Sequence, residues 1–102
     1  GFFHLEVSMV IYVVLEVGDS APNILSAHKE RTAAEREVAS YMYNEAASWL
    51  SASPEDPVAT ELLNHCKLWL MDAPQPSLEE LQTAWDDSGD TRTIDVHEVT
   101  LR

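Results

Sequence analysis

The alternation of apolar side chains over the first 17 residues constrains the fold more than any other feature of this chain. Every odd position from Phe3 to Val17 is apolar, whereas the even positions include His4, Glu6 and Glu16. A period of two is typical of a β-strand that buries one face. The sequence therefore predicts a long first strand whose odd-numbered side chains face the core.

The middle of this strand is apolar on its other face as well, because Val10, Tyr12 and Val14 occupy even positions. A strand that is apolar on both faces is central in its sheet or is covered on both sides. A second sheet, a helix or a partner chain could supply that cover. If the helices lie on one face only, we expect Val10, Tyr12 and Val14 to form the interface of a homodimer.

A second strand follows after a polar turn. The segment 18–23 is rich in Gly, Asp, Ser, Pro and Asn, which are residues that favour turns, and the segment 24–29 is a plausible strand. Together with the first strand it predicts a β-hairpin with a long loop.

The spacing of apolar residues changes from two to four after residue 32, which indicates a helix. Thr32 and Glu35 match a capping box, in which two side chains satisfy free backbone amides at a helix start. We expect this helix to run from about Ala33 to Leu50 and to pack on the sheet. Its apolar stripe consists of Ala34, Val38, Met42, Ala46 and Leu50.

Two further helices are predicted after proline-containing breaks. Either Ser53-Pro54 or Asp56-Pro57 supplies a cap followed by proline at the first helical position, and the helix extends to about Met71. Its stripe consists of Val58, Leu62, Cys66 and Leu70. An extended connection at Ala73–Pro76 precedes a capping box formed by Ser77 and Glu80. The third helix is short and turns Leu78, Leu81 and Trp85 inward.

The chain closes with a strand over residues 94–101. Its apolar alternation changes phase near His97 and Glu98, which predicts a β-bulge there. The order β-β-α-α-α-β predicts an α+β fold with a mostly antiparallel sheet of about three strands and helices packed on it. We expect one globular domain over residues 1–102. Residues 1–8 carry less weight, because Gly1 stands where Met is expected and they are either a cleavage remnant or a strand extension.

The pattern of elements resembles small accessory proteins carried by bacteriophages and prophages. The resemblance lies in the strand at 11–15, the helix start at 32–35 and the final strand at 94–101, so it covers about the first 40 residues and the end of the chain. It implies a bacterial or phage setting and no catalytic residues. The two helices between residues 52 and 90 depart from the compact form of that pattern, so the resemblance says nothing of their role.

The charge of the chain excludes several functions. Its 102 residues contain 18 acidic and 6 basic side chains, which gives a formal net charge of −12 at pH 7. Affinity for phosphates requires a basic surface, so we expect no direct binding to nucleic acid.

The uncharged stretch 7–15 is too short to cross a membrane. A single cysteine allows no internal disulfide, so we expect a protein of the reducing cytoplasm.

No constellation of residues indicates catalysis or a cofactor. Cys66 adjoins His65, but helix neighbours point about 100° apart, and Cys66 lies in an apolar stripe where it is expected to be a buried hydrophobe. The histidines, at positions 4, 28, 65 and 97, form only pairs with acidic residues, such as Glu61 with His65, whereas zinc requires three or four ligands. We therefore predict no metal site, and a small metal-dependent enzyme remains the alternative from another functional class.

The acidic residues concentrate in the C-terminal half of the chain. Residues 1–51 hold 7 acidic and 3 basic side chains, whereas residues 52–102 hold 11 acidic and 3 basic ones. Negative charge is favourable at a helix start and unfavourable at a helix end, so helix stability does not explain the acids after Trp85. We predict a non-enzymatic accessory protein that binds a protein with a basic surface through Glu79, Glu80, Asp86, Asp87 and Asp90. Two alternatives stay open: a mimic of DNA that inhibits a nucleic-acid-binding protein, and acidity that serves solubility alone.

Overall fold

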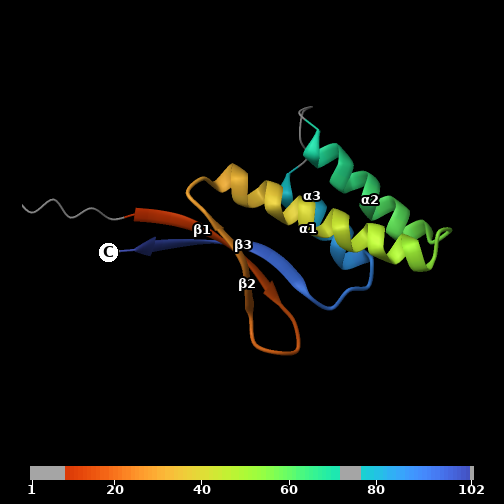
Figure 1. Cartoon of the computed structure of the whole chain (residues 1–102), viewed down its shortest axis with the longest axis horizontal. Coiled ribbons are helices and arrows are strands. Elements are labelled where there is room, and N and C mark those ends of the chain that lie inside the picture. The colour runs from red at the N-terminus through yellow and green to blue at the C-terminus, as the bar shows by residue number, and fades with distance from the viewer. Residues whose placement is uncertain (1–8, 72–76, 102) are drawn as a thin grey trace, which may run out of the picture.

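A computed structural model describes residues 9–71 and 77–101, and it confirms the α+β fold with the order β-β-α-α-α-β (Figure 1). The predicted strand residues before Met9 and the predicted connection at Ala73–Pro76 lie outside the described residues. The elements are β1 (Met9–Val17), β2 (Asn23–His28), α1 (Arg31–Ala52), α2 (Pro57–Leu70), α3 (Leu78–Asp87) and β3 (Thr93–Leu101).

The three strands form an antiparallel sheet in the order β2-β1-β3, so the first strand of the chain is central. The ladder between β1 and β3 runs without a register shift from Met9 opposite Leu101 to Val17 opposite Thr93. The predicted bulge at residues 97 and 98 is therefore wrong. An irregularity lies instead in the β1–β2 ladder between Val14 and Leu15, where the register shifts by one residue.

The two faces of β1 are the reverse of those expected from the sequence. Val14 is fully buried in the core, and its partner on β3, Val96, is buried beside it. Tyr12, on the same face, packs against that core. The even-numbered side chains thus face the helices, so the assignment of Val10, Tyr12 and Val14 to a dimer face was wrong. The odd-numbered side chains face away from the helices.

The change of phase in the apolar pattern of β3 also reflects which face of the sheet each side chain occupies. Ile94 and Val96 point toward the helices, whereas Val99 and Leu101 pair with odd-numbered residues of β1 on the opposite face. No extra residue is needed, because the strand only changes which face carries its apolar side chains.

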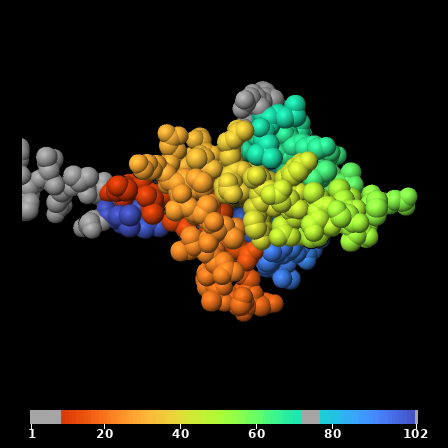
Figure 2. Space-filling model, viewed as in Figure 1, coloured from red at the N-terminus to blue at the C-terminus, as the bar shows by residue number. Residues whose placement is uncertain are grey.

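The helices form two layers above one face of the sheet. α1 contacts all three strands and α3 contacts β3, whereas α2 packs on α1 and α3 (Figure 1). The surfaces of α1 and α2 are continuous in Figure 2, in yellow and green. The core between these layers consists of Val14, Ala34, Val38, Ala39, Met42, Ala46, Leu62, Cys66, Trp69, Leu81, Trp85, Ile94 and Val96. The predicted stripe of α1 differs from its contribution to the core at two positions: Ala39 is buried although it lies outside the stripe, and Leu50 is only half-buried.

The starts of α2 and α3 follow the sequence signals. Asp56 precedes α2, and its Oδ1 accepts hydrogen bonds from the backbone N–H groups of Val58 at 3.0 Å and Ala59 at 3.3 Å, with Pro57 as the first helical residue. The Ser77 hydroxyl accepts the N–H of Glu80 at the start of α3.

The start of α1 differs from its prediction. The helix begins at Arg31, and its N-cap residue makes no side-chain cap. Thr32 therefore lies inside the first turn, and the predicted capping box does not form. Glu35 pairs instead with Arg31 across one helical turn, with 3.3 Å between Oε2 and Nε. In the described parts of the chain, no helix combines the length and apolar character that spanning a membrane requires.

Candidate functional site

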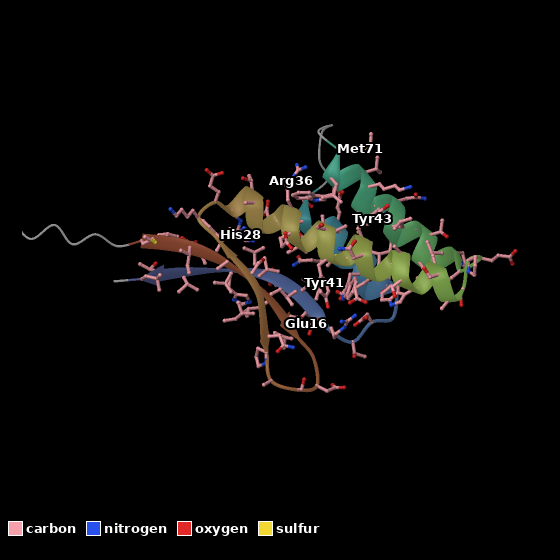
Figure 3. All side chains as sticks on the ribbon, in the orientation of Figure 1. Glu16, His28, Arg36, Tyr41, Tyr43 and Met71 are labelled. Atoms are coloured by element: carbon pink, nitrogen blue, oxygen red, sulfur yellow. The ribbon has the colours of Figure 1, made fainter. Side chains whose placement is uncertain are left out.

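Arg92, immediately before β3, is surrounded by three carboxylates and a tyrosine. Its guanidinium forms two hydrogen bonds with Asp90, from Nη2 at 2.8 Å and from Nε at 3.0 Å. Nη1 lies 3.1 Å from Glu16 and 3.6 Å from Glu45, and it donates to the hydroxyl of Tyr41 at 2.9 Å. We call these five residues the Arg92 cluster. Figure 3 labels two of its members, Glu16 on β1 and Tyr41 on α1.

Hydrogen bonding within the cluster shifts the protonation equilibria of its members. Tyr41 donates its hydroxyl proton to Glu16, and this bond, with those from Asn23 and Arg92, lowers the pKa of the Glu16 carboxyl below its ordinary value. The Arg92 side chain likewise lowers the pKa of Asp90. Burial and the bond to Glu16 raise the pKa of the Tyr41 hydroxyl. The two carboxylates are therefore ionised and Tyr41 is neutral at pH 7.

The same guanidinium also covers aromatic rings. Its carbon Cζ lies 5.3 Å from the centre of the Trp85 ring and 6.0 Å from that of Tyr41, which is within the range of cation–π contacts. The indole N–H of Trp85 donates to the Arg92 carbonyl at 2.9 Å. The guanidinium of Arg92 is thus occupied by side chains of this chain, and the Arg92 cluster is a structural junction between the sheet, α1 and α3.

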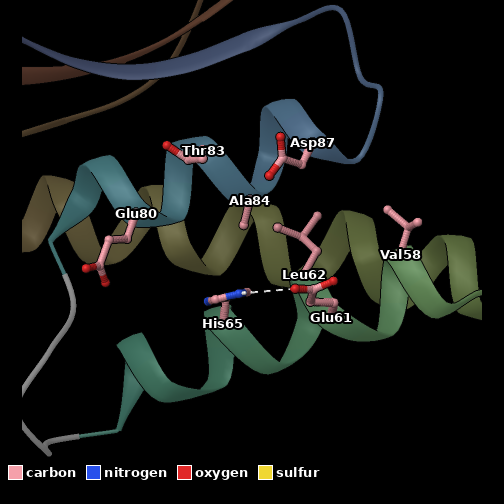
Figure 4. A pocket seen from close by; sticks show the side chains of 8 residues that line it. All are labelled: Val58, Glu61, Leu62, His65, Glu80, Thr83, Ala84 and Asp87. Carbon is pink, nitrogen blue, oxygen red and sulfur yellow. Dashed lines mark ion pairs between the residues drawn. The ribbon is translucent and has the colours of Figure 1, made fainter.

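A groove between α2 and α3 is the better candidate for binding (Figure 4). Each helix contributes four residues with the same spacing, so each presents a single stripe to the groove. The cavity has a volume of about 350 Å³. Its lining consists of Val58, Glu61, Leu62 and His65 from α2 and Glu80, Thr83, Ala84 and Asp87 from α3.

The groove combines an apolar floor with acidic walls. Val58 and the half-buried Ala84 supply exposed apolar surface, the buried side chain of Leu62 also lines the floor, and three carboxylates stand around it, on Glu61, Glu80 and Asp87 (Figure 4). No lysine or arginine is among these lining residues. The His65 ring lies 3.9 Å from the Glu61 carboxylate and forms an ion pair with it only when the imidazole is protonated. The groove is thus suited to a cation that carries an apolar portion.

Asp87 occupies a position that helix stability does not favour. It is the last residue of α3, where backbone carbonyls concentrate negative partial charge, and the last turn has no basic residue. Glu80, in contrast, lies in the first turn, where negative charge is stabilising. A positive group bound between the two helices would relieve the repulsion at Asp87.

The structure separates the five acidic residues predicted to bind a partner. Glu80 and Asp87 line the groove. Glu79 is exposed outside it, and Asp86 lines a smaller depression between α3 and β3. Asp90 faces Arg92, and both of its carboxylate oxygens accept hydrogen bonds from that side chain. The carboxylate of Asp90 is therefore already paired within the fold.

Sequence patterns identified only Glu80 and Asp87 among the eight groove residues, and only Asp90 among the five residues of the Arg92 cluster. Glu61 and His65 were considered only as a metal-binding pair, although their helical spacing to Val58 indicates a common face. The scarcity of basic residues was a signal for Arg92. It is the only lysine or arginine between residues 77 and 101, so neighbouring carboxylates have a single cation to approach.

The structure also describes the residues that a catalytic or metal-binding role would use. Cys66 is buried in the core, and burial raises the pKa of its thiol to about 12, which leaves it protonated and unreactive at pH 7. Over residues 9–71 and 77–101, no group of three or more His, Cys, Asp or Glu side chains converges on a metal position. His4 lies outside the described residues.

Comparison with models of protein families, with curated proteins and with solved structures finds no match to this chain.

Proposed function

We propose that this chain is a non-enzymatic accessory protein that binds a basic, amphipathic segment of another protein in the groove between α2 and α3. The observation that carries the proposal is the arrangement of three carboxylates around an apolar floor. Lysine and arginine side chains combine an apolar stem with a charged end, so they complement both parts of such a groove. The bacterial or phage setting rests on the sequence resemblance alone.

The shape of the groove favours a helical segment as the ligand. Two adjacent helices that each present one stripe of side chains form a groove between them. Amphipathic helices commonly bind in such grooves through residues spaced three or four apart. The exposed Val58 lies among the lining residues and offers an apolar contact. A ligand helix with apolar residues on one side and flanking lysines matches this surface in shape and in charge.

A DNA mimic is less well supported by this geometry. Mimicry of nucleic acid requires carboxylates spaced like phosphates along an exposed surface. The groove carboxylates instead come from two helices and stand on opposite sides of an apolar floor. The two functions differ in a measurable way, because a mimic competes with DNA for its target whereas a groove that binds a helix has no such requirement.

The proposal can be tested with two synthetic helical peptides. One has leucine and lysine on opposite faces, and the other has glutamine in place of every lysine; each has about 18 residues, enough for five helical turns. Fluorescence anisotropy measures their affinity for the parent protein. We expect the lysine peptide to bind at least about tenfold more tightly and to lose affinity as salt is raised.

A matched pair of double variants distinguishes the groove from the overall charge. The first is Glu80→Gln with Asp87→Asn, which removes two groove carboxylates. The second is Glu37→Gln with Glu98→Gln, which removes the same charge at exposed positions outside the groove. We expect only the first to weaken binding of the lysine peptide, by about tenfold. Equal affinity of the two peptides, or equal losses in the two double variants, would contradict the proposal.

A further inference from the structure

The face of the sheet that points away from the helices is apolar and carries almost no charge. We call it the open face. It consists of the odd-numbered residues of β1 and the residues that pair with them: Met9, Ile11, Val13, Leu15, Val17, Ile24, Ala27, Thr93, Asp95, His97, Val99 and Leu101. In the described ranges, no helix packs on this face, because the core lies on the other side of the sheet (Figure 1).

Several side chains of the open face are strongly exposed. Ile24 is 71% exposed and Met9 48%, and Val17, Val99 and Leu101 are also exposed, whereas Ile11 and Leu15 are half-buried and Val13 is buried by its neighbours in the sheet. Isolated apolar residues on a surface are ordinary, but a contiguous apolar patch of this kind is typical of an interface. The ends of β1 and β3 next to the C-terminus extend beyond the helices, where they lie side by side (Figures 1 and 2).

The single acidic side chain of the open face is turned to its border. Oδ1 of Asp95 accepts hydrogen bonds from Nε2 of Gln82 at 2.9 Å and from the backbone N–H of Val96 at 2.8 Å. The carboxylate is thereby kept at the outer edge of β3. In a chain with a net charge of −12, this leaves an apolar surface without an exposed repulsive group at its centre.

We propose that the open face is the interface of a homodimer in which two sheets pack face to face. Charge distinguishes a second copy from other occupants. A partner recognised through its basic surface would bind the acidic residues of the helices, whereas an apolar face whose one acidic side chain lies at its border is complementary to itself. The centres of protein interfaces are depleted of charged residues, and interfaces between identical subunits are the more apolar class. The two copies would be related by a two-fold axis that lies between the two sheets and parallel to them, with the same residues on both sides of the interface.

The area of the face is sufficient for such a dimer. Strands of nine residues are about 30 Å long, and three strands are about 14 Å wide, so the face projects to about 400 Å². The accessible area of a corrugated side-chain surface exceeds its projection. Two such faces in contact therefore bury on the order of 1,000 Å², which is the size that a specific interface requires.

Pairing through the strand edges is less favourable than pairing through the faces. The Gln82 side chain donates to the carbonyl of Ile94 at 3.0 Å, and Asp95 accepts the N–H of Val96, so outward-pointing backbone groups near the start of β3 already have partners. The opposite edge is β2, a strand of six residues whose ladder contains a register shift. Short or irregular edges discourage the addition of another strand.

Sedimentation of lysine variants tests the dimer. Ile24→Lys and Val99→Lys place a charge on the open face, and Leu68→Lys is the matched control, because Leu68 is an exposed apolar residue of α2, away from the sheet. Each change makes the chain less negative, so charge alone would favour association. We expect the parent to dimerise with a dissociation constant on the order of 10 µM, and the open-face variants to dimerise at least about tenfold more weakly. Leu68→Lys should sediment as the parent does.

Two results would overturn the proposal. One is a parent protein that remains monomeric up to about 1 mM, because its dissociation constant would then lie far above the value expected here for a specific dimer. The other is a dimer that Leu68→Lys weakens as much as Val99→Lys does. Circular dichroism verifies that each variant is folded. Should a lysine disturb the sheet, Val99→Thr keeps a β-branched side chain, so the strand is preserved while apolar contact is lost, and it should weaken the dimer by a smaller factor.

Discussion

The guanidinium of Arg92 lies 3.1 Å from the carboxylate of Glu16, a residue 76 positions earlier in the chain. This ion pair joins the residue before β3 to the end of β1, at the point where the chain returns from its three helices to the sheet. Tyr41 contacts both side chains, so α1 is part of the same junction. The ion pair is largely shielded, because the side chains of Arg92 and Glu16 are 28% and 16% exposed.

Replacement of Arg92 by methionine should destabilise the protein. The change leaves Asp90 and Glu16 without their cationic partner in a partly buried site, and we expect the free energy of unfolding to fall by about 2 kcal/mol. Arg31→Met is the matched control, because Arg31 forms an exposed pair with Glu35 within α1. Such pairs contribute only about 0.3 kcal/mol. Urea denaturation measures both values, and equal losses would show that the Arg92 cluster is no stronger than a surface pair.

The same cluster should make the protein sensitive to acid. The pKa values of Glu16 and Asp90 are lowered in the folded state, so both groups stabilise the fold above their ordinary pKa values of 4.5 and 3.8. This contribution is lost as the pH falls through the lowered values, because protons then bind the unfolded chain more strongly. We expect the urea midpoint to fall with pH below about 5 and to fall less steeply in Arg92→Met. Parallel curves for the two proteins would contradict this explanation.

A pair of alanine variants tests which face of β1 is buried. Val14 is fully buried under the helices, whereas Val17, on the same strand, is 38% exposed on the open face. Val14→Ala should lower the free energy of unfolding by about 2 kcal/mol, and Val17→Ala by less than about 1 kcal/mol. Thermal or urea denaturation at low protein concentration makes the comparison without a contribution from association. Larger losses at Val17 would reverse the assignment of the two faces.

The packing of α1 on the sheet can be tested at its centre. Met42 is fully buried, so Met42→Asp would place an unpaired charge in the core and should unfold the domain. Asn44→Asp adds the same charge to an exposed position of the same helix and should leave the fold intact. Circular dichroism distinguishes the two outcomes. A soluble Met42→Asp protein with unchanged thermal melting is incompatible with this packing.

Substitution of the two aspartates at the end of α3 should have different effects on peptide binding and the same effect on the free energy of unfolding. Asp86→Asn and Asp87→Asn each remove a negative charge from the last turn of the helix, so each should raise the free energy of unfolding by about 0.3 kcal/mol. Of these two residues only Asp87 lines the groove, so only Asp87→Asn should weaken binding of the lysine peptide. The anisotropy and urea measurements together check both statements. A loss of peptide affinity in Asp86→Asn would place the binding surface elsewhere on α3.

The order and the approximate limits of the elements are encoded locally, and they can be read from the sequence. Side chains at every second position share one face of a strand but are distributed around a helix, whereas side chains at every fourth position stay on one side of a helix. In α1 the positions midway between the apolar ones are polar, which excludes a strand with one apolar face, so the pattern alone distinguishes β1 from α1. The signals at Asp56-Pro57 and Ser77 are similarly local, because a cap bonds to amides two or three residues away. The concentration of acidic residues in the second half of the chain is also a property of sequence alone.

Only the tertiary structure decided which face of the sheet is buried and which acidic residues act together. β1 is apolar on both faces, so its alternation is consistent with helices on either side, and packing of α1 over Val14 made the choice. The groove depends on how α2 lies against α3. The pairing of Arg92 with Glu16 depends on β3 returning to the sheet beside β1, 76 residues later in the chain. Contacts between distant residues leave no periodic trace in a single sequence, because each partner is positioned by packing and not by its neighbours along the chain.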